Sequence, residues 1–345
     1  MDIILKISQE LMCRQEQVAA AVKLIDEGCT IPFIARYRKE ATGSLNDEQL
    51  RTLDERLTYL RGLEDRKEKV LASIEEQGML TDELKKSILA AETLVAVEDL
   101  YRPYKPKRKT RATIAQSKGL TGLANIISLQ MTNKPIPEEA LAYVSEEKEV
   151  HSAEEAIAGA MDIIAESISD NAEYRTEIRS LTMDKGILMT TAKDPEAESV
   201  YEMYYDFSTP VRKMAGYRTL AINRGEKEKF LSVKIEAPVD EITGYLIRQV
   251  IVRDNPNTND ILRNTITDSY ERLIAPSIER DIRSSLTEAA EDGAIKVFGS
   301  NLKQLLMQPP INGHVVLGWD PAFRTGCKLA VVDATGKVLA TKVIY

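Results

Sequence analysis

The stretch NDEQLRTLDERLTYLRGLEDRKEKVLASIEEQG, residues 46–78, decides the fold class. Asn46 is a favourable helix N-cap, and Asp47 and Glu48 suit the positive end of a helix dipole. Apolar residues then follow at steps of three or four: Leu50, Leu53, Leu57, Leu60, Leu63, Val70 and Ile74. This pattern predicts one long amphipathic helix that packs against other helices as core, rather than as a zipper for a partner.

The residues before this helix predict two shorter helices. An apolar face runs along residues 15–27, and Gly28 follows as a left-handed helix cap. A short turn leads into a second helix that carries Arg36, Arg38 and Lys39. This order fits a helix-turn-helix that contacts nucleic acid through those three residues. It fits a plain helical hairpin with a solvated basic tip equally well.

Beyond residue 78 the pattern stays mainly helical. Helices are expected over 152–170, 172–184, 242–252 and 259–308, the last interrupted at Pro276 and Gly293. Short strands are expected at 186–191 and 231–235. The aromatic residues within 201–207 are interpreted as packing between helices, and the charged run 223–229 as a solvated turn. After residue 310, three apolar runs separated by Pro321, Gly326 and Gly336 predict three strands.

The composition excludes several classes of protein. Hydrophobic residues make up 43% of the 345 residues, enough to form a core. No apolar run reaches the about 20 residues of a membrane helix, and the N-terminus has no secretion-signal pattern, so we expect a cytoplasmic protein with no membrane contact. The three cysteines form no CxxC pair, and the two histidines have no partner at metal-ligand spacing. We therefore expect no metal and no cofactor.

Charge is distributed unevenly along the chain. From Leu100 to Pro137 there are eight Lys or Arg residues and no Asp or Glu, although the whole chain has a formal charge of −8. The densest part comprises Arg102, Lys105, Lys107, Arg108, Lys109 and Arg111. Beside Tyr101 and Tyr104, such a loop can follow a phosphate backbone and stack on bases. The alternative is an extended connector whose charges pair with acidic helices around it.

Four long motifs resemble the Tex family of bacterial transcription accessory proteins. They are TIPFIARYRKEATGSLNDEQL at 30–50, EDLYRPYKPKRKTRATIA at 98–115, LAINRGEKEKFLSVKI at 220–235 and EAAEDGAIKVFGSNLKQLLMQPP at 288–310. The stretch VLGWDPAFRTGCKLAVVD at 316–333 follows them. These motifs are ordered along nearly the whole chain, so coincidence does not explain them.

The resemblance implies a domain order. Residues 1–205 would be a helical region with the helix-turn-helix, 206–312 a central helical region with a short strand, and 313–345 the start of a YqgF-type, RNase H-like α/β domain. The family continues with helix-hairpin-helix elements and an RNA-binding OB-fold domain. We therefore expect this chain to be the front part of such a protein, with apolar surface exposed over 313–345.

Asp320 is the one residue at a position that looks catalytic. RNase H-like nucleases place an Asp on their first strand, and further carboxylates complete a site for two Mg²⁺ ions about 4 Å apart. Asp333 is better interpreted as a turn residue, so Asp320 is a weak metal candidate and we expect no enzyme activity. The family usually has Gly where this sequence has Ala322, which would strain the turn if that position needs a positive φ.

The resemblance and the basic residues together imply a non-catalytic transcription accessory factor that binds RNA or DNA through phosphate contacts. The alternative is a protein-interaction scaffold that docks on RNA polymerase or other transcription factors. In that alternative, nucleic-acid affinity resides mainly in the OB-fold domain of the family.

Overall fold

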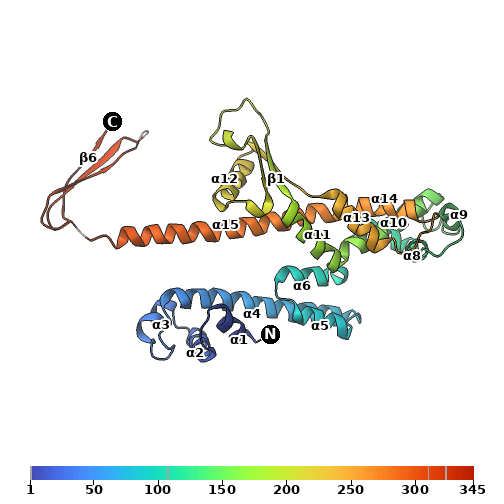
Figure 1. Cartoon of the computed structure of the whole chain (residues 1–345), viewed down its shortest axis with the longest axis horizontal. Helices are drawn as coiled ribbons and strands as arrows, with labels where there is room; N and C mark the ends of the chain where they lie inside the picture. Colours follow the sequence, from blue (N-terminus) through green and yellow to red (C-terminus); the bar gives the residue numbers. More distant parts are fainter. Residues whose placement is uncertain (1, 107–108, 310, 323–324) are drawn as a thin grey trace.

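Figure 1 shows the computed structural model of the chain, which describes residues 2–106, 109–309, 311–322 and 325–345. Two helical bodies are joined to each other, and α15 (Ala275–Leu306) runs out of the larger body towards a separate three-stranded sheet. The fold class is therefore mainly α, as the sequence predicts. No helix in the described part of the chain is long and apolar enough to cross a membrane.

The smaller body is built around the predicted long helix. It contains α1 (Ile3–Glu10), α2 (Gln15–Asp26), α3 (Ile31–Tyr37), α4 (Asp47–Glu76), α5 (Asp82–Ala90) and α6 (Leu94–Tyr101). Asn46 caps α4, since its Oδ1 accepts from the Gln49 N–H at 2.8 Å while Gln49 Oε1 accepts from the Asn46 N–H at 3.0 Å. The whole predicted apolar stripe is buried, and Ile7, Val18 and Ile34 lie in the same core.

Helices α2 and α3 confirm the predicted order of helix, turn and helix, but α3 ends at Tyr37, so Arg38 and Lys39 lie just after the second helix rather than on it. Residues 27–30 join them, and Gly28 has a φ of +83°, the left-handed conformation expected of a helix cap.

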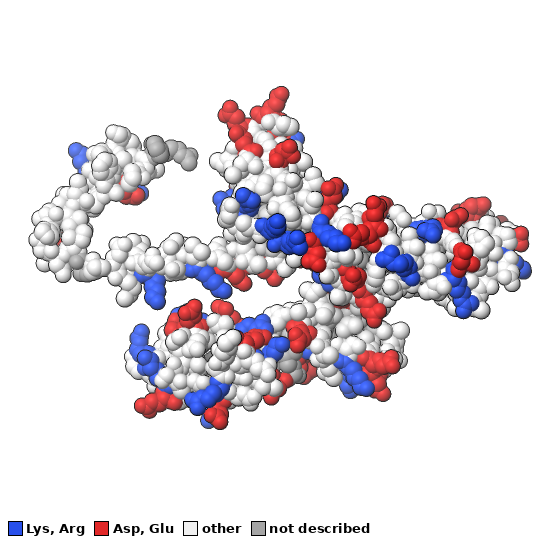
Figure 2. Space-filling model, in the orientation of Figure 1, with Lys and Arg blue, Asp and Glu red and all other residues white. Residues whose placement is uncertain are grey.

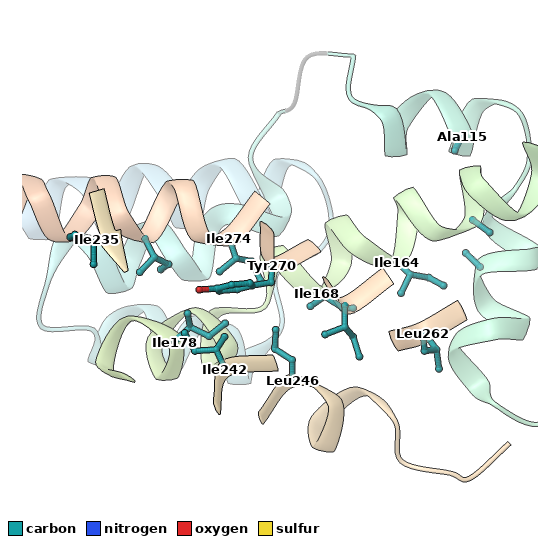
Figure 3. Packing of buried hydrophobic residues seen from close by; sticks show 14 of the residues in the cluster. Ala115, Ile164, Ile168, Ile178, Ile235, Ile242, Leu246, Leu262, Tyr270 and Ile274 are labelled. Atoms are coloured by element: carbon teal, nitrogen blue, oxygen red, sulfur yellow. The ribbon is translucent and has the colours of Figure 1, made fainter. Parts of the chain in front are cut away.

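The larger body has its own apolar core, shown in Figure 3. Its helices are η1 (Arg102–Tyr104), α7 (Arg111–Ser117), α8 (Thr121–Leu129), α9 (Ile136–Leu141), α10 (Ala153–Asp170), α11 (Ala172–Lys185), α12 (Gly216–Lys227), α13 (Val239–Val250), α14 (Asn259–Asp268) and η4 (Ser269–Ile274). Ile164 and Ile168 of α10 meet Leu246, Leu262 and Tyr270 near the centre of this core. The core includes residues on both sides of 205/206, and the domain division at that position stays a prediction.

A three-stranded antiparallel sheet lies on the larger body. It consists of β1 (Ile187–Ala192), β2 (Asp206–Pro210) and β3 (Leu231–Glu236) in the order β2–β1–β3. The sequence predicts β1 and β3 but misses β2, because the stretch 206–210 is short and ends in a proline, so it lacks a strand pattern of its own. The aromatic residues around it pack on this sheet rather than between helices: the Tyr204 and Phe207 rings are 5.5 Å apart, and those of Tyr201 and Phe230 5.8 Å apart.

Two further predictions are corrected by the helices. The run 223–229 is mostly the last turn of α12 rather than a solvated turn. Helix α15 is continuous through Gly293, because a single glycine weakens a helix without ending it. Pro276 also lies inside α15, at its second residue, where a missing N–H is tolerated and the π-helical turn η4 comes just before.

The three predicted strands after residue 310 are confirmed as β4 (Val316–Asp320), β5 (Cys327–Val332) and β6 (Val338–Ile344), an antiparallel sheet in that order. The predicted turn role of Asp333 is also confirmed, since its Oδ1 accepts from the N–H groups of Thr335 and Lys337 at 2.8 and 3.0 Å. Ala322 does not have a positive φ, so its side chain causes no strain there. Trp319 is 64% exposed, in line with the apolar surface expected in this region.

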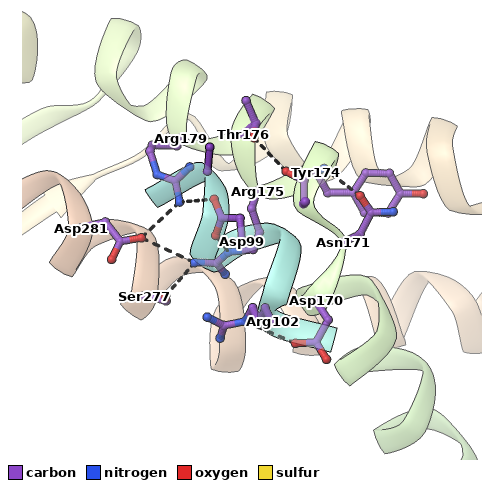
Figure 4. Close-up of polar contacts among 12 residues, drawn as sticks. Asp99, Arg102, Asp170, Asn171, Tyr174, Arg175, Thr176, Arg179, Ser277 and Asp281 are labelled. Atoms are coloured by element: carbon purple, nitrogen blue, oxygen red, sulfur yellow. Dashed lines mark hydrogen bonds and ion pairs between the residues drawn. The ribbon is translucent and has the colours of Figure 1, made fainter. Parts of the chain in front are cut away.

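A buried ionic network joins the two bodies (Figure 4). Arg175 of α11 is 1% exposed, and its Nε donates to Asp99 Oδ1 of α6 at 2.7 Å. Its Nη2 donates to Ser277 Oγ of α15 at 2.8 Å. Arg179 Nη2 lies 2.8 Å from the other Asp99 oxygen and 3.3 Å from Asp281 Oδ2. One buried carboxylate of the smaller body is thus held by two guanidinium groups of the larger one.

The chemistry of Arg175 makes this junction dependent on Asp99. Burial lowers the pKa of Arg175, whereas its hydrogen bond to Asp99 raises that pKa. Helix α6 also places Val97 and Tyr101 in the core of the smaller body. The network therefore connects two separately packed cores through a directional polar contact.

Replacement of Arg175 by Met should lower the free energy of unfolding by about 3–5 kcal/mol, because the buried Asp99 carboxylate loses one of the two guanidinium groups that hold it. In the double variant Asp99→Asn/Arg175→Met the carboxylate is gone as well. The two changes together should then cost less than the sum of the single changes. Urea unfolding of the four proteins measures this coupling, and simple additivity would contradict the role assigned to the pair.

Candidate nucleic-acid interface

Helix α3 and the two residues that follow it carry an exposed surface of aromatic and basic side chains. We call it the α3 surface and define it as Phe33, Arg36, Tyr37, Arg38 and Lys39. Phe33 is 37% and Tyr37 61% exposed, and their ring centroids are 5.3 Å apart. Residues 33, 36 and 37 lie on one side of a helix, so all three point outward when the opposite side of the helix packs in the core. Ile34 provides that contact in the core of the smaller body.

The two arginines of the α3 surface are stacked on its rings. The Arg38 guanidinium lies 5.2 Å from the Phe33 ring centroid, and that of Arg36 5.9 Å from the Tyr37 centroid. Within the described ranges, no carboxylate forms an ion pair with Arg36, Arg38 or Lys39. Figure 2 shows Lys and Arg atoms at this end of the smaller body. The positive charges therefore remain available to an anion from outside.

The loop after α3 is held by α2. The Gln17 amide donates to the carbonyl oxygens of Thr42 and Gly43 at 3.3 and 2.8 Å. Thr42 is buried, and its hydroxyl donates to the Arg38 carbonyl at 3.2 Å. Gly43 has a φ of +59°, a conformation that favours glycine. These bonds fix the backbone that carries Arg38 and Lys39.

Two residues of the second predicted basic set form ion pairs within the chain. Arg102 Nε lies 3.3 Å from Asp170 Oδ1, and Lys105 Nζ lies 3.8 Å from Glu98 Oε2. These two residues behave as the connector alternative predicts. Lys107 and Arg108 lie outside the described residues.

Arg111 and Lys109 differ in their surroundings. Arg111 is the first residue of α7 and faces acidic side chains of the larger body. Burial raises the pKa of Asp162, and the positive charges of Arg272 and Arg111 lower it. Lys109 is exposed. Among the described residues, Lys109 forms no ion pair, so its charge is available to a phosphate group.

The structure does not bring the two basic sets together. The α3 surface lies at the start of α4, whereas Tyr104 lies at its end, where its carbonyl accepts from Gln77 Nε2 at 3.0 Å. Helix α4 has 30 residues, which corresponds to a length of about 45 Å. One short nucleic-acid segment cannot contact both sets at once.

Asp320 lies exposed at the end of β4, opposite Lys328 of β5. Over the residues that the structure describes, no three His, Cys, Asp or Glu side chains gather into a group that could hold a metal ion. The nearest strand partner of Asp320 is therefore a cation rather than a second carboxylate.

The prediction of site residues missed the two rings. Phe33 and Tyr37 are four residues apart. Arg36 stacks on the ring of Tyr37, its neighbour in the sequence, and Arg38 stacks on the ring of Phe33, five residues earlier. This spacing, next to a single buried apolar residue, is the signal that could have identified them.

Three family models match successive parts of the chain. They describe a Tex-like protein N-terminal domain at residues 1–75, a Tex central region-like segment at 131–298 and a Tex protein YqgF-like domain at 314–345. Together they match four-fifths of the sequence, and along the chain they follow the order N-terminal domain, central region and YqgF-like domain.

Pairwise alignments that cover nearly the whole of this chain agree with the family models. The chain is 50% identical over 343 residues to YdcI of Bacillus subtilis (strain 168), which covers 99% of this chain and 48% of that protein. It is 41% identical over 355 residues to the transcriptional accessory protein Tex of Neisseria gonorrhoeae, covering 100% and 46%. Human S1 RNA-binding domain-containing protein 1 is 31% identical over 345 residues, covering 95% and 34%. The chain thus spans about half the length of the bacterial relatives it matches.

The contact between Gln17 and the loop after α3 predicts a difference between two glycines. Gly43→Ala should destabilise the chain by more than about 1 kcal/mol, because an added Cβ strains the positive φ and meets the Gln17 amide at 2.8 Å. Gly28→Ala causes the same kind of backbone strain, but no atom lies within 4 Å of its added Cβ, so it should destabilise the chain less than Gly43→Ala does. Equal urea midpoints for the two variants would show that Gln17 does not hold this loop.

Proposed function

This chain belongs to the Tex family of transcription accessory proteins, and from that membership we propose that it binds nucleic acid without catalysis, through the α3 surface. The observation that carries the proposal is a set of three cations without carboxylate partners in the described structure, two of which, Arg36 and Arg38, are stacked against two exposed rings. Cations of this kind contact phosphate, and exposed rings stack on bases. RNA or DNA would be bound with little sequence preference, because every base has a face on which a ring can stack.

The comparisons support RNA as the first ligand to test. One relative is named an S1 RNA-binding domain-containing protein, and another a transcriptional accessory protein. A factor that acts during transcription meets single-stranded RNA as well as duplex DNA. The α3 surface suits a single strand, since base faces are accessible to Phe33 and Tyr37 only when the bases are unstacked.

The absence of catalysis is the second part of the proposal. It is supported by the surroundings of Asp320, whose strand neighbour is Lys328. Two-metal hydrolysis needs several carboxylates converging on one place. A carboxylate facing a cation at an exposed strand end fits a structural role instead.

One observation favours a second candidate function, docking on RNA polymerase or another transcription protein. Ile295, Phe298, Leu302 and Leu305 of α15 follow one another at steps of three or four residues, and all four are exposed. An exposed apolar helix face of this kind is typical of protein–protein contacts. In that case the α3 surface would contribute little to nucleic-acid affinity, and capture of a transcription protein would survive nuclease treatment.

The triple variant Arg36→Gln/Arg38→Gln/Lys39→Gln should bind a fluorescein-labelled oligouridylate more weakly. The plot of log affinity against log salt should become flatter by about 2, since each lost phosphate contact on a single strand removes about 0.7. Tyr37→Ala should lose a further about 1–3 kcal/mol of binding at fixed salt. Fluorescence anisotropy over a salt series measures both effects.

The matched control is Lys85→Gln/Lys86→Gln/Lys296→Gln, which removes three exposed charges elsewhere. A control that weakens binding as much as the α3 variant would mean that total charge, rather than the α3 surface, sets the affinity. Unchanged binding by the α3 variant would reject the proposal and leave protein docking as the better candidate.

Incubation with labelled RNA or DNA and Mg²⁺ or Mn²⁺ should give no cleavage above that of an Asp320→Asn variant, because a lone carboxylate cannot position two metal ions. Gel analysis of the products measures this. Cleavage by the unaltered chain that disappears in Asp320→Asn would establish a nuclease.

A further inference from the structure

The larger body has a second basic surface, far from the one on α3 along the chain. We call it the α12 surface and define it as Arg212, Lys213, Tyr217, Arg224 and Lys227. All five side chains are exposed, and Tyr217 is 67% exposed. The first two belong to η3 (Val211–Lys213) and the other three to α12. Figure 2 shows Lys and Arg atoms gathered over α12 and the adjoining part of the sheet.

The packing of α12 fixes which side chains point outward. Ile222 and Gly225 are buried, and a Cβ added to Gly225 would lie 2.7 Å from the side chain of Leu231. Tyr217, Arg224 and Lys227 follow one another at steps of seven and three residues, so they share the opposite side of the helix. From Tyr217 to Arg224 the helix rises by about 10 Å.

The start of the surface is fixed in the same way. Val211 is buried, and its N–H donates to the Gly186 carbonyl next to β1 at 2.9 Å. Arg212 and Lys213 follow directly in a 3-10 turn and point away from that anchor as exposed residues. The cations of η3 and α12 are thus carried by anchored elements of one body that follow each other directly in the chain, and we call them the basic row.

The positive charge of this row is not neutralised within the described residues: none of its four cations forms an ion pair. The nearest acidic residue in the sequence, Glu226, is held by Arg283 of α15, whose Nη1 donates to it at 3.0 Å. Glu228 interacts with the Tyr201 hydroxyl. The acidic residues of this segment are therefore engaged elsewhere, and the basic ones face solvent.

An arginine beside the row holds the exposed ring in place. The Arg218 guanidinium lies 5.6 Å from the Tyr217 ring centroid and 5.4 Å from that of Phe207 on β2. The Phe207 ring in turn packs edge-on against buried Tyr204 at 5.5 Å. Tyr217 is thus supported through a chain of ring and cation contacts that ends in the core, while most of its own surface remains accessible.

We propose that the α12 surface is a second binding site for single-stranded nucleic acid, at which Arg212, Lys213, Arg224 and Lys227 contact successive phosphates and one base stacks on Tyr217. A row of cations alone would suit any polyanion, including an acidic protein segment. The supported, exposed ring distinguishes the two, because base stacking needs a flat aromatic face and an acidic peptide does not. The site lies on a different body from the α3 surface, so each can bind or fail to bind on its own.

The test uses the full chain and anisotropy with the labelled oligouridylate. Arg212→Gln/Lys213→Gln/Arg224→Gln should flatten the salt dependence by about 2, because three phosphate contacts are lost. Tyr217→Ala should weaken binding roughly tenfold, and Tyr217→Phe should restore it, because phenylalanine keeps the stacking face. The control Lys85→Gln/Lys86→Gln/Lys296→Gln removes the same charge elsewhere. Thermal midpoints identify any unfolded variant, for which the single change Arg224→Gln is substituted.

The outcomes separate this site from the α3 surface and from a protein-binding role. Each α12 variant is also made in the Arg36→Gln/Arg38→Gln/Lys39→Gln background, where the same further loss is expected. Loss from the α3 change alone, with none from the α12 changes, overturns this inference and leaves the proposed function intact. Binding of polyglutamate that falls with the α12 cations, while Tyr217→Ala leaves oligouridylate binding unchanged, also overturns it and identifies an acidic protein partner instead.

Discussion

The contact of Asp99 with Arg175 and Arg179 is the constraint on which the arrangement of this molecule depends. Each body has an apolar core of its own, and apolar faces alone tolerate sliding and rotation. A buried carboxylate that needs two guanidinium groups at 2.7 and 2.8 Å permits little of either. We interpret the network as the element that fixes the orientation of the two bodies, because its charges are stabilised only when both are in place.

That junction has a consequence for the two basic surfaces. The α3 surface is anchored through Ile34 in the smaller body, and the α12 surface through Val211 and Ile222 in the larger one. Neither surface contacts the network, yet their relative position is set by it. If both surfaces bind phosphate as proposed, they do so from a rigid frame, and affinity would come from several weak contacts rather than from one pocket.

Local density of charge proved a poor guide to available charge. The basic run around Arg102 and Lys105 is the most conspicuous feature of the sequence, but these two residues face Asp170 and Glu98. The three cations of the α3 surface are less conspicuous, but none of them forms an ion pair in the described structure, and two of them stack on aromatic rings. A positive side chain is available to a phosphate when no carboxylate of the chain already pairs with it. Here Glu98 is close to Lys105 in the sequence, whereas Asp170 comes from a distant helix and reaches Arg102 only in the folded chain.

By itself, the sequence determined the long helix from Asn46 to Gly78, the helix–turn–helix before it, the three final strands and the family, because periodic apolar residues, caps and turn residues act over a few neighbouring positions. Only the tertiary structure decided the rest. Strand β2 forms because β1 offers it a ladder, Arg175 is buried because Asp99 lies opposite although 76 residues away, and Tyr217 is an exposed, supported ring because Arg218 also reaches Phe207. Such contacts join residues that share no local pattern, so only the folded chain brings them together.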